Sequence, residues 1–214
     1  MRPTSVSTTF AAALATSVCA AQAKGAAGDL TLNGSAVSGG VATLVANSFV
    51  TLTSSGNDTA RTGTVYGTDS SGWIVSQTLT LGNAGAVTTT IGFYTVTRVA
   101  VSGSIAGTIS VGNAQAGTSA VIAMDINIPA IAIALGAVVS GTVNYDVQAT
   151  LDDIWSTTFN NGTATWFTHP TLVGQVASLS SNYAYPVRAI RLRQNSGSGT
   201  TTLTVVQSGI TGNS

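Results

Sequence analysis

Few residues of this chain have the chemistry that catalysis needs. His169 is the only histidine, in "FTHPT", and it is the natural candidate for a general base acting on one of the many serines. The sequence contains no G-x-S-x-G motif, which in hydrolases presents a serine nucleophile on a sharp turn. We therefore expect His169 to be a polar turn residue held by Pro170 and not a catalytic base.

Two neighbouring carboxylates, Asp152 and Asp153 in "TLDDIW", are the next candidates. Adjacent side chains of a strand point to opposite faces, so the pair is poorly placed for glycoside hydrolysis. The D-x-D-x-D-G spacing of a calcium loop is absent, Cys19 is the only cysteine, and the glycines do not form a phosphate-binding G-x-x-x-x-G-K motif. We expect a strand-end turn here, and a protein without catalytic residues, metal or cofactor.

The strongest local charge feature is "VRAIRLRQ", in which Arg188, Arg191 and Arg193 make up three of the seven basic residues. On a strand, Arg191 and Arg193 share one face and Arg188 lies on the other. A nucleic-acid surface needs a basic domain and interleaved aromatic side chains, but the chain has zero formal net charge and this segment has no aromatic residue. Contact with another subunit or domain is our first interpretation, a solvated strand the second and nucleic acid the third.

Aromatic and arginine side chains dominate the energetics of protein interfaces. We therefore add Trp155, Trp166 and Tyr185 to the three arginines as candidate interface residues. For the two tryptophans, packing in the core is an equally good interpretation.

The composition predicts the elements that must position these residues. The chain lacks glutamate and has one lysine, whereas helical surfaces rely on such long side chains. Strand and turn formers such as Val, Thr, Gly and Ser are abundant, and 44% of the residues are hydrophobic, which is enough to supply a core. The sequence therefore predicts an all-β protein.

Alternating strands and Gly/Ser turns recur along the chain. "TDSSG", residues 68–72, predicts a hairpin, and residues 136–151 predict one long strand. "FYTVTRVAVSGSIAGTISV" resembles "YAYPVRAIRLRQNSGSGTTTLTVV", and both predict hairpins about 90 residues apart, close to a β-sandwich length. We predict two tandem antiparallel β-sandwich units, jelly-roll or Ig-like, over residues 28–117 and 118–214.

Residues 1–27 precede these units and are expected to form an extended or short helical arm. Arg2 and the apolar stretch 10–21 imitate a signal peptide, but that stretch is mostly Ala, Thr and Ser and is weakly hydrophobic. An uncleaved arm is therefore favoured. The apolar run 128–139 is shorter than the roughly 20 residues that a spanning helix needs, so we expect no membrane partner.

Several phrases are similar to virion structural proteins of tailed bacteriophages. They are "W-F-x-H-P", "Y-P-V-R-A-I-R-L" and "T-L-T-V-x-Q-x-G" within residues 165–209, and "V-x-G-T-D-x-x-G" and "T-V-T-x-V" within residues 56–112. The resemblance implies β-sandwich domains, no enzymatic activity and a place in the virion, which is assembled in the host cytoplasm.

The expected function is a head decoration or cement protein that stabilises contacts between capsid subunits as a homo-oligomer. Its partners would be the major capsid protein or head–tail and tail proteins. A tail or head–tail accessory or fibre-attachment protein is the first alternative. A secreted bacterial surface or adhesin subunit, with residues 1–23 removed as a signal peptide, is the second. A carbohydrate-binding or hydrolytic tail domain that uses Asp152 or His169 is the third.

Overall fold

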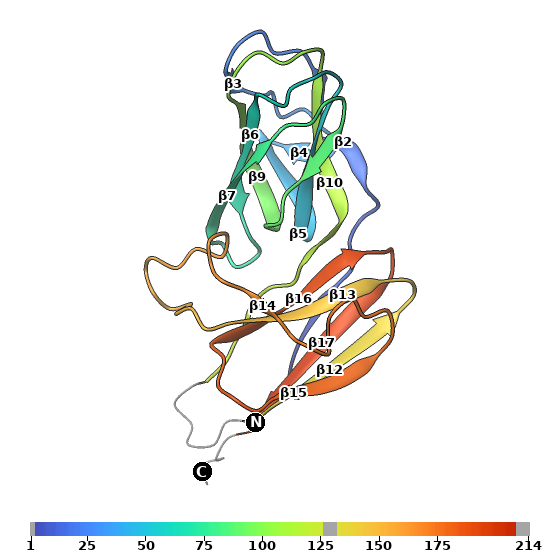
Figure 1. The fold of residues 1–214 in the computed structure, drawn as a ribbon, viewed down its shortest axis with the longest axis vertical. Coiled ribbons are helices and arrows are strands. Elements are labelled where there is room, and N and C mark those ends of the chain that lie inside the picture. Colours follow the sequence, from blue (N-terminus) through green and yellow to red (C-terminus); the bar gives the residue numbers. More distant parts are fainter. Residues whose placement is uncertain (1–2, 126–131, 209–214) are drawn as a thin grey trace. The chain divides into compact units, whose positions relative to one another are not determined.

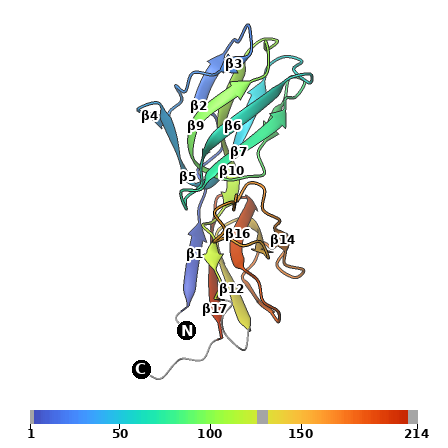
Figure 2. The ribbon, with the colours of Figure 1, turned by 90° about the vertical axis from the view of Figure 1, so that its left-hand side faces the viewer.

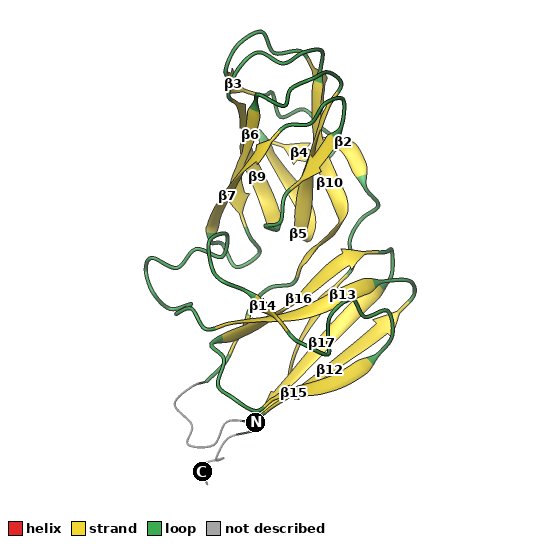
Figure 3. Cartoon of the chain, in the orientation of Figure 1, coloured by secondary structure: helices red, strands yellow, loops and turns green. Residues whose placement is uncertain are grey.

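The computed structural model describes residues 3–125 and 132–208, and over these residues it consists of strands joined by loops (Figure 3). The predicted all-β class is confirmed. In this described part of the chain, no helix is long and apolar enough to cross a membrane. Of the apolar run 128–139, residues 128–131 lie outside the described residues, and most of the remainder forms a strand.

The chain folds into two compact units (Figure 1). One is formed by Phe10–Gly117 and is called the continuous unit below. The other combines Met1–Thr9 with Thr118–Ser214 and is called the split unit. The chain therefore starts in the split unit, builds the whole continuous unit, and then returns.

In the continuous unit the strands follow the order β2–β10–β5–β9–β6–β7, with β3 beside β9, and β4 and β8 beside β5. β5 changes its partners along its length: residues 41–43 pair with β4 or β9, and residues 51–53 pair with β8. Between these parts Ala46 has a φ of 52°, which breaks the register. The strands are β2 (Leu14–Gln22), β3 (Gly28–Asp29), β4 (Val37–Ser38), β5 (Val41–Ser54), β6 (Thr62–Thr68), β7 (Ile74–Thr80), β8 (Ala86–Thr88), β9 (Phe93–Val101) and β10 (Ile109–Thr118).

The hairpin expected at residues 68–72 is present between β6 and β7, where Thr68 pairs with Ile74. The carboxylate of Asp69 accepts hydrogen bonds from the amides of Ser71 and Trp73, at 2.9 and 3.1 Å, and so holds the turn. This is the Asx-type turn chemistry that makes aspartate common at such positions.

The split unit is a β-sandwich of two sheets. One sheet has the order β1–β17–β12–β15, and the other contains β14–β13–β16 with β11 added to β16. Alternate residues of both sheets, including Leu135, Leu203, Val147 and Leu192, are buried in one hydrophobic core. The strands are β1 (Thr4–Thr8), β11 (Ile122–Ala123), β12 (Ile133–Ser140), β13 (Asn144–Thr150), β14 (Phe167–Thr168), β15 (Leu179–Tyr183), β16 (Ala189–Ser196) and β17 (Thr200–Gln207).

Both hairpins predicted from the similar segments 93–111 and 183–206 are absent, because the two strands of each do not pair with each other. β16 and β17 do not pair with each other but lie in opposite sheets of the sandwich, and β9 and β10 are separated by β5. The predicted long strand 136–151 is likewise two strands, β12 and β13, in opposite sheets. Gly141 and Gly197 have φ of 82° and 104° at two of these crossings. A strand–glycine–strand pattern is common to hairpins and to sheet-to-sheet crossings, so the sequence could not separate them.

The N-terminal segment predicted as an arm is built into both units as strands and contains no helix over its described residues. β1 pairs with β17, and Figure 2 shows the two strands side by side. Hydroxyl pairs tie them together, Ser5 with Thr204 at 2.8 Å and Ser7 with Thr202 at 2.7 Å. β2 pairs with β10 and supplies the fully buried Val18 to the core of the continuous unit.

Candidate functional site

The largest irregular segment of the split unit is the loop of residues 151–166, which joins β13 to β14 and is called the interface loop below. It is a series of tight turns. The amide of Ser156 donates to the carbonyl of Asp153, the amide of Phe159 to Ser156, and the amide of Thr163 to Asn160. Long loops with defined internal bonding are frequent carriers of binding function.

Arg191 fastens this loop to β16. Its side chain is 7% exposed, and its Nε donates to Oε1 of Gln148 at 2.9 Å while Nη1 donates to Oδ1 of Asn161 at 3.1 Å. Its guanidinium lies 4.0 Å from the ring centroid of Trp166, within the range of a cation–π contact. The planar guanidinium of arginine can donate hydrogen bonds in its own plane while its face stacks on an aromatic ring. Arg191 therefore acts within the unit and is not an exposed anchor.

Arg188 supplies a second attachment. Its Nη2 lies 3.2 Å from Oδ1 of Asp153, and this ion pair is partly exposed to solvent. Arg193 is half-buried and stands opposite Asp146 in the β13–β16 register. The three arginines predicted as one interface cluster thus have separate surroundings. Arg188 and Arg191 each bond to a residue of the interface loop.

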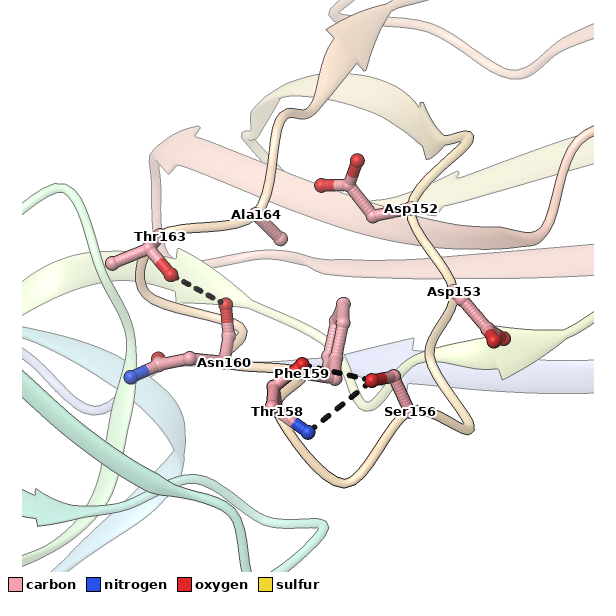
Figure 4. Close-up of a pocket in the computed structure, with 8 residues that line it drawn as sticks. All are labelled: Asp152, Asp153, Ser156, Thr158, Phe159, Asn160, Thr163 and Ala164. Carbon is pink, nitrogen blue, oxygen red and sulfur yellow. Dashed lines mark hydrogen bonds between the residues drawn. The ribbon is translucent and has the colours of Figure 1, made fainter.

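The two neighbouring carboxylates of the loop diverge, as expected from their adjacency. Oδ2 of Asp152 accepts a hydrogen bond from the amide of Thr165 at 2.6 Å, whereas Asp153 turns to Arg188. Figure 4 shows the two side chains pointing away from each other around a hollow of about 280 Å³. No group of three or more His, Cys, Asp or Glu side chains within the described residues is placed to hold a metal ion. Both carboxylates serve the loop's own hydrogen bonding.

His169 is buried directly after β14, and its ring is fully engaged. Nδ1 accepts hydrogen bonds from the amides of Thr171 and Leu172, at 3.1 and 3.3 Å, so this nitrogen carries no proton. Nε2 therefore carries the proton and lies 3.2 Å from the carbonyl oxygen of Asn182. The hydroxyl of Ser181 is also 3.2 Å from Nε2, but a protonated nitrogen cannot accept the serine proton. This is the reverse of the arrangement in a Ser–His pair that activates serine.

Trp155 and Tyr185 are the candidate residues that the structure leaves exposed, at 74% and 55%. Trp155 lies in the interface loop, where its amide bonds to Oδ1 of Asp153 at 3.3 Å. Tyr185 lies between β15 and β16, with its ring 5.5 Å from that of Tyr183. Trp166 is half-buried beneath Arg191. Trp166 thus packs against Arg191 within the unit, whereas Trp155 and Tyr185 are exposed on the surface.

Tyr185 also borders an apolar pocket of about 240 Å³ in the split unit. The floor is formed by buried residues, among them Tyr183, and the rim by Leu151 and Phe167, which are 57% and 55% exposed. The pocket is lined by Ala149, Leu151, Phe167, Thr168, Tyr183, Tyr185 and Val187. Sequence reasoning missed this pocket because its residues come from β13, β14, β15 and the two loops beside them. The only signal was the aromatic density of "SNYAYP" and "TWFTHP".

Comparison of the chain with protein-family models, with curated proteins and with solved structures finds no match.

Proposed function

We propose that this protein is a non-enzymatic structural subunit of a tailed-bacteriophage virion and acts as a head decoration or cement protein. The observation that carries the proposal is the set of exposed apolar side chains on and beside the fastened interface loop: Leu151, Trp155, Phe167 and Tyr185. Leu151, Phe167 and Tyr185 border the same pocket, and Trp155 lies in the same loop as Leu151. Exposed apolar side chains that are grouped in this way are typical of protein–protein contacts. The resemblance of residues 165–209 to phage virion proteins supplies the class of partner.

Two further features support a contact role. The loop is held at Asn161 by a buried arginine and at Asp153 by an ion pair, so less backbone conformational entropy is lost when the loop binds a partner. The formal net charge of zero leaves little self-repulsion, which favours association into oligomers.

The N-terminal strands also bear on the choice between a virion protein and a secreted surface protein. Cleavage before Lys24 would remove both β1 and β2, including the buried Val18 and Cys19. β17 of the split unit would lose its partner β1, and β10 of the continuous unit would lose its partner β2. This favours a functional protein that retains residues 1–23, as the virion proposal requires.

The test is co-sedimentation of the purified protein with capsids of the phage whose genome encodes it, prepared without the protein. We expect the protein to sediment with capsids. Trp155→Ala and Tyr185→Ala should each weaken binding by roughly tenfold or more, because anchor residues of interfaces commonly lose this much. Ile74→Ala, at a 79% exposed apolar position of the continuous unit, is the matched control and should bind normally.

Sedimentation with tails but not with capsids would contradict the decoration role and identify a tail component instead. N-terminal sequencing of the protein from its natural source provides an independent check. A mature chain that begins at Lys24 would contradict the virion proposal in favour of a secreted surface subunit.

A further inference from the structure

One outer strand of the continuous unit, β7, has an open edge. It stands last in the order β5–β9–β6–β7 and pairs with β6 alone, at the margin of the unit (Figure 1). The pairing continues without a register shift over all seven residues of β7. Within residues 3–125 and 132–208, no other segment forms a backbone–backbone hydrogen bond with β7. Its outer edge therefore presents unpaired backbone donors and acceptors.

The hydrogen bonds at the two ends of the β6–β7 pairing show which residues form this edge. At the turn, the amide of Asp69 donates to the carbonyl of Trp73 at 3.0 Å. At the other end, the amide of Leu81 donates to the carbonyl of Arg61 at 2.9 Å. Bonded and non-bonded pairs alternate along an antiparallel ladder, so residues 75, 77 and 79 bond to β6 between these ends. The intervening residues direct their amides and carbonyls outward and have exposed side chains: Ile74, Ser76, Thr78 and Thr80.

Other outer strands of the protein are covered or short. The carbonyl of Val18 in β2 accepts a hydrogen bond from the amide of Gly34 at 3.0 Å, and the carbonyl of Asn182 in β15 lies 3.2 Å from Nε2 of His169. β14 has only two residues. Charged residues, prolines and bulges are the usual protection of an open edge, and β7, "IVSQTLT", has none of them. A regular edge of this kind is a template for a further strand.

A second copy of β7 matches this edge. The four outward-facing residues are spaced symmetrically about Gln77. An antiparallel copy with Gln77 opposite Gln77 therefore brings outward donors opposite outward acceptors. Ile74 then lies opposite Thr80, and Ser76 lies opposite Thr78. Because β7 carries no charge, and the chain has zero formal net charge, this pairing brings no like charges together.

The side chains suit the same pairing. Ile74 is 79% exposed, and a strand beside it would cover part of this apolar surface. The hydroxyls of Thr64 and Thr78 bond across the β6–β7 pair at 2.9 Å, and a hydroxyl can donate to one partner while it accepts from another. Ser76 of the second copy can therefore extend this row of hydroxyls. Because both copies use the same surface, the pairing closes as a dimer.

We propose that β7 pairs with β7 of a second copy of this chain, antiparallel and centred on Gln77. The two β6–β7 hairpins then form one continuous sheet in a symmetric dimer. The proposal does not rest on the proposed function, which concerns side chains of the split unit.

Sedimentation velocity of the full-length protein tests the association. We expect the native chain to reach the sedimentation coefficient of a dimer by roughly 100 µM, a concentration at which a micromolar interface is occupied. Ser76→Pro removes one outward amide, leaves the bonds to β6 in place and occurs twice in a symmetric interface. It should weaken the dimer by about tenfold or more, since each lost hydrogen bond costs roughly fivefold in affinity.

Ser76→Ala is the matched control. It shortens the same side chain but keeps the amide donor, so it should dimerise like the native chain. A native chain that stays monomeric, or a dimer that Ser76→Pro does not weaken, would overturn the proposal. If Ser76→Pro does not fold, cross-linking decides the test.

Two single substitutions, Ser76→Cys and Thr78→Cys, report the register, and Cys19 stays buried in both. Residues 76 and 78 of the two copies lie directly opposite, at roughly 5.5 Å between Cα atoms, which a disulfide can span. Two copies of residue 76 lie diagonally, at roughly 7–8 Å, which a disulfide does not span. Mild oxidation of the mixed variants should therefore give a linked dimer, and oxidation of either variant alone should not. No linked dimer from the mixture, or equal linkage of one variant alone, would overturn the proposal.

The dimer and the capsid contact can fail separately. A monomeric native chain that still co-sediments with capsids in a Trp155-dependent way would overturn the dimer and leave the proposed function intact. A dimer that Ser76→Pro dissociates, without co-sedimentation, would support this proposal and contradict the proposed function.

Discussion

Each unit holds an arginine against an aromatic ring, but the two pairs differ in burial. In the continuous unit, the guanidinium of Arg98 lies 4.7 Å from the ring centroid of Tyr66 and forms an ion pair with Asp29. The side chains of Arg98 and Asp29 are 51% and 56% exposed. In the split unit, Arg191 lies 4.0 Å from Trp166 and is almost fully buried. An arginine–aromatic pair therefore lies on an exposed sheet surface in one unit and fastens a loop in the other.

The difference extends to the rest of the two surfaces. Of the exposed large apolar side chains in the described part of the chain, four belong to the continuous unit and nine to the split unit. The interface loop and the apolar pocket are both in the split unit. The split unit therefore has more of the exposed apolar side chains on which the proposed contact role depends.

The largest effect is expected from removing residues 1–23, since this deletes one strand from each unit. The exposed edges of β10 and β17 and the loss of the buried Val18 should leave no cooperative thermal transition and a tendency to aggregate. Circular dichroism during heating and solubility after expression provide the measurement. A chain that lacks only residues 1–3 keeps β1 and should melt as the full protein does. A shortened chain that melts at the normal temperature would show that neither unit needs its N-terminal strand.

The two arginines provide the next test. Arg191→Ala should lower the free energy of unfolding by about 3 kcal/mol, because buried acceptors lose a charged donor and Trp166 loses its stacking partner. Arg98→Ala, the matched change at an exposed ion pair, should leave the unfolding midpoint unchanged within error. Urea denaturation of both variants measures the difference. Equal losses would contradict the contrast in burial on which the comparison depends.

The connections between the last two strands of each unit provide a smaller test. Gly197 and Gly107 have φ of 104° and 100°, so alanine is strained at both. A Cβ at Gly197 would lie 2.3 Å from the backbone oxygen of Thr142, whereas at Gly107 its nearest neighbour is the Ser55 hydroxyl, 2.5 Å away, which can rotate. We expect Gly197→Ala to cost about 3 kcal/mol and Gly107→Ala about 1 kcal/mol. Thermal denaturation ranks the two variants, and the reverse order would argue against the crossing at Gly197.

The smallest expected effect concerns Cys19, a buried reporter within the continuous unit. Burial raises the pKa of its thiol to about 12, so at pH 8 almost none of it is the reactive thiolate. Iodoacetamide should leave Cys19 unmodified in the native protein and modify it only as the continuous unit unfolds, as mass spectrometry can follow. Because the two units have separate cores, Arg191→Ala should not shift the urea concentration at which modification begins. Earlier modification in that variant would show that the units unfold together.

Composition was sufficient to predict the fold class, and local turn chemistry was sufficient for the hairpin at Asp69. Both depend on residue types acting on their immediate neighbours. The pairing of β16 with β13, and not with β17, depends on which hydrophobic face each strand presents to a core assembled from the whole unit. The alternation of Ile190 and Leu192 indicates a buried face but not the strand beside it.

In the candidate site, too, features that depend on neighbouring residues could be predicted, and features that depend on the tertiary fold could not. Alternation places Arg191 and Arg193 on one face of β16, but it did not predict that their surroundings differ, and Asp152 and Asp153 have different partners, as their adjacency suggested. Burial of Arg191 required the interface loop to fold over β16, which no local pattern encodes. The pocket at Tyr183 required residues from three strands, and such convergence arises only from the tertiary fold.

The position of β1 has a consequence for how the protein is made. Ser5 bonds to Thr204 across a separation of 199 residues, so β1 leaves the ribosome long before its partner β17. The continuous unit can close as soon as β10 has emerged, whereas the split unit must wait for β17 with its first strand unpaired. Contacts of such high sequence separation slow folding and prolong the exposure of unpaired strands during synthesis. The polar sequence of β1, "TSVST", suits a segment that must stay soluble through that delay.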